Sequence, residues 1–595
     1  MGSETILLLG VSMSLLINTV RISNFRGISD VEVGLLRTTV LFGGNNAGKT
    51  SIIKAIQLAL GDYSRFLSNE DFHITVDDTS QAKITVDLRI VPVGGGEIPE
   101  EWYEIFEDNI QSLPDGEQFV AIRTTAEPDV IKGGYKVERY YLNEWPEPVN
   151  WPLATVKSTN KITKRFESLP FISVDAQRDI HAELKDKMSF INRILSEIKY
   201  SEAEVTDIET KIAELNALTV ETSAPLQKLR ANLDKLSDSL SGDGIADITP
   251  FSKKVRDLSK QFCVHFGESE NTSFSIEYHG MGTRSWASML TVRAFIELLA
   301  DKYQEEAQPF FPILAAEEPE AHLHPNAQRT LYQQLREISG QVIISTHSPY
   351  ILGTSTIKNL RGVVRELGNI KVTQLVEGLD VEDINTLNRE IMNHRGELLF
   401  SKAIVLFEGV TEEQILPSVL KSYFGKSCFS LGINCISVGG TNYAPYIKMA
   451  LSFGIPVCIL SDNDGNIKRD LTSTIKKIRE SSLTLIDDNF LVSYLSSGND
   501  IEAELVSSIS IKEEIVEALV ISETRGSDNP NYIQAKQGEI SALSENDLIL
   551  RMRDSKASYA AYLGEIIERY PSGEKEMKFV SPAILDVIRK LEEWV

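Results

Sequence analysis

Residues 40–51 read VLFGGNNAGKTS, an apolar run followed by the phosphate-binding pattern Gly-x4-Gly-Lys-Thr. The apolar run predicts a buried strand that ends at Phe42, and residues 51–60 predict a helix. Glycines let the loop backbone turn its N–H groups toward phosphate oxygens, and Lys49 reaches the terminal phosphates. The Thr50 hydroxyl would hold Mg²⁺. The residues expected to bind ATP and its Mg²⁺ are Gly43, Asn45, Asn46, Gly48, Lys49, Thr50 and Ser51.

Two later segments carry the acidic groups and the histidine that such a site needs. Residues 312–325 read PILAAEEPEAHLHP, so an apolar strand ends in two carboxylates. In phosphoryl-transfer sites one carboxylate, here Glu317, completes the Mg²⁺ shell, and another group, here Glu318, orients the attacking water. Residues 342–349, VIISTHSP, predict another strand, which ends at His347 where a sensor of the terminal phosphate is expected. A histidine that only packs at a strand end is the alternative.

These motifs, together with residues 22–27 (ISNFRG), resemble the ABC-type ATPase heads of the Rad50, SMC and RecF group. Glu317 stands where that group has Asp, and its longer side chain implies slow ATP turnover. The resemblance also implies a signature segment that contacts ATP on a second protomer, so that a complete site requires a dimer. The candidate segment is residues 279–285 (HGMGTRS), before an expected helix over residues 286–300, and the family's lid glutamine corresponds to Gln177. The candidate signature glycines are Gly280 and Gly282.

Between the two ATPase segments, residues 185–245 predict a helical hairpin. Apolar residues recur every three or four positions on both sides of Pro225, which is typical of helices that pack along one face. Each arm has only about two to three heptads, which suits dimerisation better than a long DNA tether. Packing on the ATPase core is the alternative. The recurring residues are Val205, Ile208, Ile212, Leu215, Leu226, Leu229, Leu233, Leu236 and Leu240.

The C-terminal third carries a second set of strand-end carboxylates. The apolar runs 403–407 and 455–460 predict buried strands, and acidic residues follow each run. Parallel strands end at one edge of a sheet, where α/β proteins place their chemistry, so these groups predict a site for Mg²⁺ or Mn²⁺. A capped helix start and an Asp-rich surface turn are the alternatives. The four carboxylates are Glu408, Glu412, Asp462 and Asp464.

A strand-end Glu-Gly with a later Asp-x-Asp resembles the Toprim fold, the metal-binding module of topoisomerases, primases and some nucleases. An ABC-type head followed by a Toprim domain is the arrangement of the OLD (overcoming lysogenization defect) family, and residues 389–402 resemble that family's junction. The resemblance starts at Met13, the expected natural start. It implies an α/β protein that forms a homodimer or higher oligomer, in which the ATPase regulates a metal-dependent nuclease. The expected domains are an ATPase N-terminal lobe (13–184), a helical hairpin insertion (185–245), an ATPase C-terminal lobe (246–390) and a Toprim nuclease domain (396–595).

The resemblance also assigns roles to individual residues. The four carboxylates become metal ligands, with Glu408 at the reacting centre, and Glu502 becomes a ligand of a second metal. In a two-metal reaction one ion lowers the pKa of the attacking water and the other stabilises the leaving oxygen. Lys556 would neutralise the phosphate in the transition state, with an exposed helix lysine as the alternative. Gly409 and residues 439–440 would let the backbone approach the site or the substrate.

Composition limits the partners. The formal net charge is −25, so contact with nucleic acid requires a local basic surface. Candidates are residues 157–165, 253–256 and 468–479, and the last is favoured because it follows Asp464 closely. Four cysteines without paired spacing indicate neither a zinc site nor a disulfide framework, which suits the cytoplasm. The apolar residues 6–17 are too short to cross a bilayer, so no membrane association is expected.

The function expected from these patterns is an ATP-hydrolysing, metal-dependent DNA endonuclease or nickase that serves in antiphage defence. An RNA substrate such as tRNA would fit the same site, because phosphate contacts carry no sequence information. In another class, the chain would be an ATP-dependent DNA-binding assembly protein with a non-catalytic Toprim scaffold, although a scaffold does not need four carboxylates. A helicase or a retron component is a candidate accessory partner.

Overall fold

The structure is a computed structural model in which most of the chain is described. Four expectations fall outside the described residues: the start at Met13, the lid glutamine Gln177, most of the second hairpin arm, and the basic run 253–256. Residue 279 of the signature segment also lies outside them. The described residues are 15–61, 67–74, 83–129, 131, 133–175, 201–228, 265–266, 274–275, 280–366, 368–376, 379–393, 395–480, 487–509, 511–525, 527–570 and 578–595.

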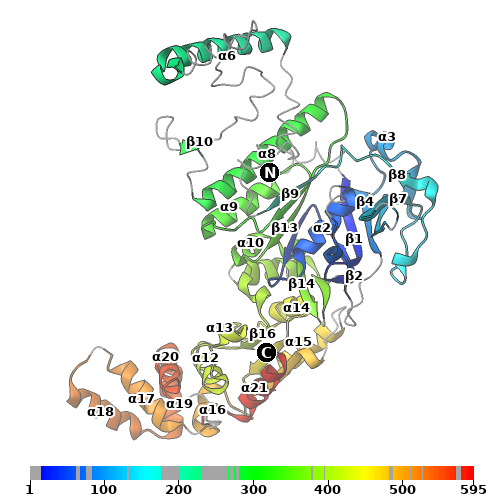
Figure 1. The fold of residues 1–595 in the computed structure, drawn as a ribbon. Helices are drawn as coiled ribbons and strands as arrows, with labels where there is room; N and C mark the ends of the chain where they lie inside the picture. Colours follow the sequence, from blue (N-terminus) through cyan, green and yellow to red (C-terminus); the bar gives the residue numbers. More distant parts are fainter. Residues whose placement is uncertain are drawn as a thin grey trace.

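The N-terminal lobe is built on an antiparallel sheet with the strand order β2-β1-β4-β6-β7-β8, and β5 pairs with β6 (Figure 1). Polar and buried positions alternate along β2, as expected for a strand with one face in the core. The strands are β1 Leu15–Phe25, β2 Ile28–Gly34, β4 Ile84–Pro92, β5 Gln111–Ser112, β6 Gln118–Pro128, β7 Tyr135–Leu142 and β8 Lys161–Ile162. Short helical turns in this lobe are η3 Asn69–Asp71, η4 Glu100–Trp102, α3 Tyr103–Phe106, η5 Glu107–Asn109, η6 Trp151–Leu153 and η7 Ser158–Asn160.

The second sheet has the order β15-β14-β3-β13-β12-β9 and is parallel except for β15. All five residues of β3 are buried, because both faces of the sheet are covered. Helix α2 (Lys49–Leu60) packs between the two sheets, and α8, α9 and α10 cover the opposite face. The remaining bounds are β3 Thr38–Phe42, β9 Phe171–Asp175, β12 Ile313–Glu317, β13 Gln341–Thr346, β14 Leu360–Glu366, β15 Asn369–Gln374, α8 Met281–Glu305, α9 Pro325–Arg336 and α10 Pro349–Thr354.

The first arm of the expected hairpin is present as α6 (Glu202–Thr222), which lies at the far end of the ATPase region from the C-terminal domain (Figure 1). Its start carries a capping box, in which the Ser201 side chain accepts from the Glu204 N–H and the Glu204 carboxylate accepts from the Ser201 N–H. Leu215 and Leu218 are exposed on this helix, at 46% and 58%. Two short strands, β10 His265–Phe266 and β11 Phe274–Ser275, pair with each other.

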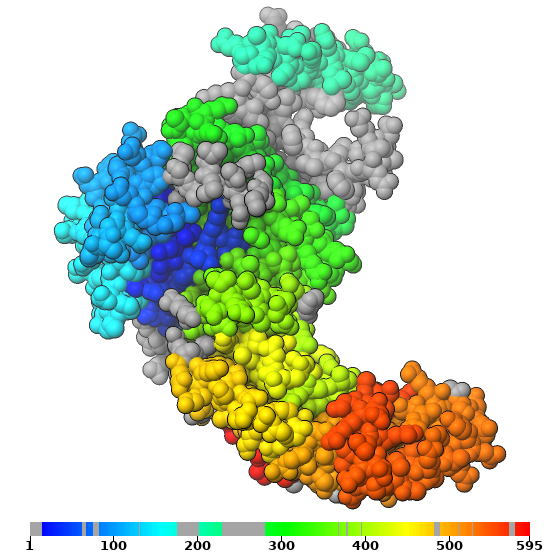
Figure 2. All heavy atoms as spheres, turned by 180° about the vertical axis from the view of Figure 1, so that it is seen from behind, coloured from blue at the N-terminus to red at the C-terminus, as the bar shows by residue number. Residues whose placement is uncertain are grey.

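The C-terminal domain is built on a parallel four-stranded sheet with the order β17-β16-β18-β19. Helices α14 and α15 cover one face, and α12 and α21 cover the other. Helices α17 to α20 form a further helical layer at the end of the molecule (Figures 1 and 2). The bounds are β16 Ala403–Phe407, β17 Ile433–Ser437, β18 Val457–Ser461, β19 Phe490–Tyr494, α12 Val410–Phe424, α13 Cys428–Leu431, α14 Ala444–Phe453, α15 Ile467–Glu480, η14 Asp487–Asn489, α16 Ile501–Ser507, α17 Lys512–Glu523, α18 Pro530–Ser541, α19 Glu545–Asp554, α20 Lys556–Ile567 and α21 Pro582–Trp594.

One hydrophobic core joins the second ATPase sheet to the C-terminal domain. Phe42, the last residue of β3, packs edge-on against Phe400 and Phe453, with ring centroids 5.9 Å and 5.4 Å away. The link between the domains consists of α11 Val381–Leu387, the π-helix Asn388–Met392 and η13 Gly396–Phe400, while η11 Ile357–Asn359 directly precedes β14 of the ATPase sheet. The residue directly before the phosphate loop therefore contacts the second domain.

Helices long and apolar enough to cross a membrane are absent from the described parts of the chain.

Candidate nucleotide site and carboxylate centre

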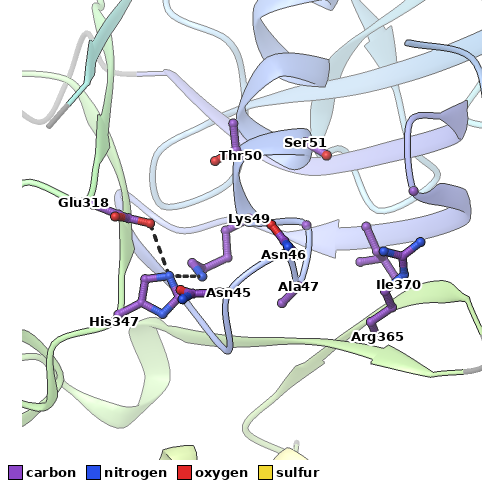
Figure 3. Close-up of a pocket in the computed structure, with 12 residues that line it drawn as sticks. Asn45, Asn46, Ala47, Lys49, Thr50, Ser51, Glu318, His347, Arg365 and Ile370 are labelled. Carbon is purple, nitrogen blue, oxygen red and sulfur yellow. Dashed lines mark hydrogen bonds and ion pairs between the residues drawn. The ribbon is translucent and has the colours of Figure 1, made fainter. Parts of the chain in front are cut away.

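The strand order brings the three ATPase motifs together. β13 lies between β3 and β12, and all three strands are parallel. The phosphate loop after β3, His347 after β13 and Glu318 after β12 therefore meet at one edge of the sheet (Figure 3). Gly48 has φ 109°, and a Cβ there would lie 2.1 Å from the Ile370 Cδ1 atom. The loop requires glycine at this position, because a side chain would collide with the β14–β15 hairpin.

Lys49 is held at the centre of the loop. Its Nζ donates to the backbone oxygens of Gly43 and Gly44 at 3.1 Å and 3.0 Å, and lies 2.8 Å from the His347 Nε2 atom. Burial lowers the pKa of Lys49 to about 8, although Glu318 and Glu320 oppose this shift. A cation that has lost part of its hydration is an effective partner for phosphate oxygens.

His347 connects Lys49 to Glu318. The His347 Nε2 atom lies 3.2 Å from the Glu318 Oε1 atom, and Figure 3 shows both side chains on the same side of the loop. Burial and the Lys49 cation lower the pKa of His347, which keeps the imidazole neutral at pH 7. Glu318 has φ 47°, so its backbone adopts a left-handed conformation that non-glycine residues seldom occupy. Strained backbone of this kind is concentrated at functional sites.

Glu320 is a residue of this site to which the sequence assigned no role. Its Oε1 atom accepts from the Thr346 hydroxyl at 2.6 Å and from the His347 N–H at 2.8 Å. Burial raises the pKa of Glu320, although these donors oppose the shift. The side chain therefore fixes the turn that presents His347. Its place in the run Glu317-Glu318-Pro319-Glu320 was the signal available in the sequence.

Glu317 lies beside α2 and is mostly buried, at 8% exposure. Its Oε1 atom is 3.0 Å from the Nζ of Lys54, which is one helical turn after Thr50. Thr50, Ser51 and Glu318 line a pocket of about 640 Å³, but Glu317 is not among its lining residues. The other lining residues are Gly27, Asn45, Asn46, Ala47, Gly48, Lys49, His347, Arg365 and Ile370.

The candidate signature glycines lie outside this pocket. Gly280 caps α8, and Gly282 lies in its first turn. The helix therefore begins at residue 281 rather than at the expected residue 286, with Gly280 as its N-cap. A Cβ on Gly282 would lie 2.5 Å from the His322 carbonyl oxygen, so glycine is required where the two segments cross. Their expected role toward ATP of a second protomer stays a prediction.

In the C-terminal domain, Glu408 directly follows β16, and its carboxylate turns toward the end of β18. The Oε1 atom accepts from Ser461 Oγ at 3.0 Å, from the Asp462 N–H at 3.3 Å and from the Tyr443 hydroxyl at 3.3 Å. Burial raises the pKa of Glu408 despite these donors. The turn after β17 fixes its backbone, because the Gly440 N–H donates to the Glu408 oxygen at 3.0 Å.

Among the carboxylates of this centre, Glu412 and Asp462 have the most strongly raised pKa values. Burial and the neighbouring Glu502 and Glu408 raise the pKa of Glu412 to about 7. Burial together with Glu412, Glu408 and Asp500 raises the pKa of Asp462 to about 8. The Oδ1 atom of Asp462 is buried, and no described group donates a hydrogen bond to it. Burial is the main cause of both shifts, and neighbouring carboxylates add to it.

Glu502 is completely buried in the first turn of α16. It accepts from the Thr411 hydroxyl at 2.7 Å and from the Lys556 Nζ at 3.1 Å. Burial opposes the charge on Lys556, but Glu502, Asp500 and Glu412 raise the pKa of this lysine above its usual value. The start of α20 thus lies beside the carboxylates, as expected for Lys556, while Thr411 gave no signal in the sequence.

The neighbours of Glu502 have different roles. Asp500 caps α16 through the Ala503 N–H and pairs with Arg553 Nε at 2.8 Å. Burial opposes the ionised form, but these partners hold the pKa of Asp500 below its usual value. Glu504 is also fully buried, and it accepts from the Ser496 N–H at 3.2 Å, which fixes the loop after β19. Glu502 therefore contacts Thr411 and Lys556, whereas Glu504 contacts the loop after β19, and the expected role of Glu502 toward a second cation stays a prediction.

The donor set suits a hard divalent cation, because its groups are carboxylate oxygens and Asp462 has an unpaired buried oxygen. Across the described ranges, however, no three acidic, histidine or cysteine side chains converge tightly enough to enclose a metal ion. Carboxylates that repel one another move apart unless a cation holds them. The ligand set therefore stays a prediction: Glu408, Glu412, Asp462 and Asp464 for one cation, and Glu502 for a second.

Comparison with known proteins finds matches to both domains. Residues 16–128 and 97–352 match the AAA ATPase domain, and residues 399–464 match the overcoming lysogenization defect protein-like TOPRIM domain. The chain is 23% identical over 525 residues to the Old nuclease of Escherichia phage P2, with 84% of this chain and 85% of that protein covered. It is 22% identical over 480 residues to endonuclease GajA of Bacillus cereus strain VD045, with 76% and 75% covered. The solved C-terminal region of the Burkholderia pseudomallei OLD protein aligns at 19% identity and a TM-score of 0.24, over 33% of this chain and 98% of that one.

Proposed function

The chain belongs to the OLD family, with an AAA ATPase domain followed by an OLD-like Toprim domain, and we propose that it is an ATP-dependent, Mg²⁺- or Mn²⁺-dependent endonuclease. Its substrate is the phosphodiester backbone of DNA. Its relatives are named a nuclease and an endonuclease, which supports this reaction class. Antiphage defence is the role we infer for it.

The observation that carries the proposal is the unbalanced charge of the Toprim centre. Glu408, Glu412 and Asp462 have raised pKa values, and the buried Oδ1 of Asp462 has no donor among the described groups. A scaffold gains nothing from buried carboxylates that repel one another, because each one destabilises the fold. A site that binds divalent cations requires them.

The residues of the centre have distinct tasks in this reaction. Bound divalent cations would lower the pKa of an attacking water and stabilise the leaving oxygen. Glu408, Glu412, Asp462 and Asp464 would hold the first cation, and Glu502 would contribute to the second. The Glu502 carboxylate also holds the Lys556 Nζ at 3.1 Å, which aims its positive charge at the phosphate on which negative charge develops.

ATP acts through the first domain. Lys49 and the loop N–H groups bind its phosphates, Thr50 and Glu317 complete the Mg²⁺ shell, and Glu318 with His347 orients the attacking water. Gly280 and Gly282 contact ATP bound to a second protomer, so the active form is a homodimer or higher oligomer. The Phe42 contact with Phe400 and Phe453 supports communication between ATP and the Toprim domain.

The test is a cleavage assay on supercoiled plasmid, linear DNA and tRNA, with Mg²⁺ or Mn²⁺, and with no nucleotide, ATP or a non-hydrolysable ATP analogue. We expect nicked or linear plasmid only when a divalent cation is present. Cleavage of tRNA alone would change the substrate to RNA. If all three nucleic acids stay intact under every condition while ATP is hydrolysed, the nuclease proposal is wrong and an assembly role replaces it.

A further inference from the structure

Helix α15, beside the Toprim centre, is basic, although the chain as a whole is acidic. The protein has 60 Lys and Arg residues against 85 Asp and Glu residues. Within Ile467–Glu480, by contrast, five basic residues face only two acidic ones, Asp470 and Glu480. The helix lies at the surface of the Toprim domain (Figures 1 and 2). A local basic surface matters most on an acidic protein, because the rest of the surface repels nucleic acid.

Four of these basic residues form a stripe along one side of the helix. Leu471 and Ile478 are buried and face the sheet. Seven residues, about two turns, separate Arg469 from Lys476, and eleven residues, about three turns, separate Lys468 from Arg479. These spacings align the members of each pair, at about 100° per residue. The two rows are neighbours around the helix: Lys468 and Arg479 lie next to the buried face, and Arg469 and Lys476 lie on the side opposite to it. At 1.5 Å per residue the stripe extends over roughly 16 Å, the length of about five phosphates along one DNA strand.

The stripe starts at the carboxylates. The Ile467 N–H donates to the Asp464 carbonyl oxygen at 3.3 Å, so the helix begins directly after the second Asp of the centre. The Lys468 Nζ lies 4.9 Å from the ring centroid of Tyr494, the last residue of β19. Tyr494 pairs with Ser461, which directly precedes Asp462. One end of the stripe is therefore held at the sheet edge that carries the chemistry.

Acidic neighbours neutralise little of the charge on Lys468, Arg469 and Lys476. Arg469 lies 3.5 Å from Asp470, and Lys476 lies 3.8 Å from Glu480, but all four side chains are more than half exposed. Pairs this exposed contribute little and are screened by salt, so a phosphate can displace the acidic partner. Among the described residues, Lys468 has no acidic partner within 4 Å.

We propose that the stripe Lys468, Arg469, Lys476 and Arg479 binds the sugar-phosphate backbone of the strand that the Toprim centre cuts. This rests on the proposed nuclease function and adds to it the path of the substrate away from the carboxylates. The stripe binds charge and not bases, so it holds any sequence equally. It guides the scissile phosphate to the cations because its first residue follows Asp464 by only four positions.

The test compares two double variants that remove the same charge. Arg469→Gln/Lys476→Gln removes two members of the stripe. Lys136→Gln/Lys211→Gln removes two exposed lysines of β7 and α6, each of which also has an acidic partner, the largely buried Glu138 and the exposed Asp207. Binding of the full-length proteins to a fluorescein-labelled DNA duplex of mixed sequence is measured by fluorescence anisotropy over a series of salt concentrations. A metal chelator is present so that the DNA is not cut. Cleavage of the same duplex is measured in Mn²⁺.

Each phosphate contact contributes about 0.9 to the slope of log affinity against log salt. Loss of two contacts should lower the slope by about 1.8 and weaken binding about 30-fold at about 0.15 M salt. In cleavage the stripe variant should raise KM at nearly unchanged kcat, while the control variant matches the wild type in both assays. If the two double variants have the same DNA affinity, salt dependence and KM, the proposal that the stripe binds DNA is wrong. A wild-type protein that neither binds nor cuts DNA would instead refute the nuclease function itself.

Discussion

The nucleotide site and the carboxylate centre are built alike but treat charge in opposite ways. Both lie where adjacent parallel strands end. In the first, His347 lies between Lys49 and Glu318, at 2.8 Å and 3.2 Å, so a cation and a carboxylate lie near each other within the protein. In the second, burial and neighbouring carboxylates raise the pKa values of Glu412 and Asp462, and Asp462 Oδ1 has no described donor. The first site therefore keeps its shape without an ion, whereas the second depends on cations to become a compact ligand set.

Removal of Asp462 should have the largest effect. Asp462→Asn replaces an ionisable oxygen with a neutral amide and should lower DNA cleavage about 10³-fold or more, because cation-supported stabilisation amounts to several kcal/mol, and each 1.4 kcal/mol is a factor of ten. ATP hydrolysis should be retained. Asp207→Asn, on exposed α6, is the matched control. Full cleavage by Asp462→Asn would mean that the charge imbalance has no catalytic purpose.

Removal of Lys49 tests the nucleotide site. Lys49→Ala should lower ATP hydrolysis about 10²- to 10³-fold, because a positioned charge on the transferred phosphate is lost. It should leave Mn²⁺ binding to the Toprim domain unchanged, as measured by calorimetry. Lys211→Ala is the control. Retained ATP hydrolysis would contradict the assignment of the loop.

The contact between the two regions tests whether they communicate. Phe453→Ala removes the ring 5.4 Å from Phe42 and should lower the free energy of unfolding by about 3 kcal/mol, whereas Phe453→Leu should cost about 1 kcal/mol. Both can be measured by urea denaturation. If the shared core transmits the state of the loop, the leucine variant should keep ATP hydrolysis but lose part of the nucleotide effect on cleavage. An unchanged nucleotide effect would show that the core only joins the domains.

Glu320 allows the nucleotide site to be tested without removing Lys49, the positive charge expected to contact the phosphates. Glu320→Ala leaves the Thr346 hydroxyl and the His347 N–H without their acceptor and should lower ATP hydrolysis about tenfold. Glu320→Gln keeps an oxygen in place and should restore most of the rate. Equal loss in both variants would mean that the negative charge, and not the hydrogen bonds, is what matters.

The smallest expected effect is the change of folding stability with pH, measured in the presence of a metal chelator. The folded-state pKa values of Asp462, about 8, and Glu412, about 7, lie above their unfolded values near 4. The folded protein therefore keeps protons that the unfolded chain releases, and stability is lost as pH rises through 7 and 8. We expect the melting temperature of the protein to fall by several degrees between about pH 6 and 9. Asp462→Asn should flatten this slope, and Mn²⁺ should reverse it.

Much of the fold was predictable because strand-end chemistry is local. The apolar runs 40–42, 313–316, 342–345 and 403–407 are buried strands in the structure, and each is followed by the residue expected to bind phosphate or metal. The start of α8 was wrong by five residues, because helix ends are set by caps such as Gly280, which the apolar pattern does not report.

Other parts of the sites gave no local signal. Thr411, Tyr443 and Arg553 have ordinary neighbours in the sequence, and each reaches its carboxylate from a different helix or loop. The contact of Phe42 with Phe453 joins residues from two domains. Such contacts depend on how the elements pack, which residue spacing does not encode.

The sequence by itself determined the two chemistries, because a Gly-x4-Gly-Lys-Thr loop and carboxylates at strand ends permit few other uses. It also determined their order along the chain. Only the tertiary structure decided which strands are neighbours, since the order β3-β13-β12 joins residues nearly three hundred positions apart. It alone decided which carboxylates are buried together, and so which site is balanced in charge and which depends on cations. The physical reason is that burial and electrostatic interaction act through space and not along the chain.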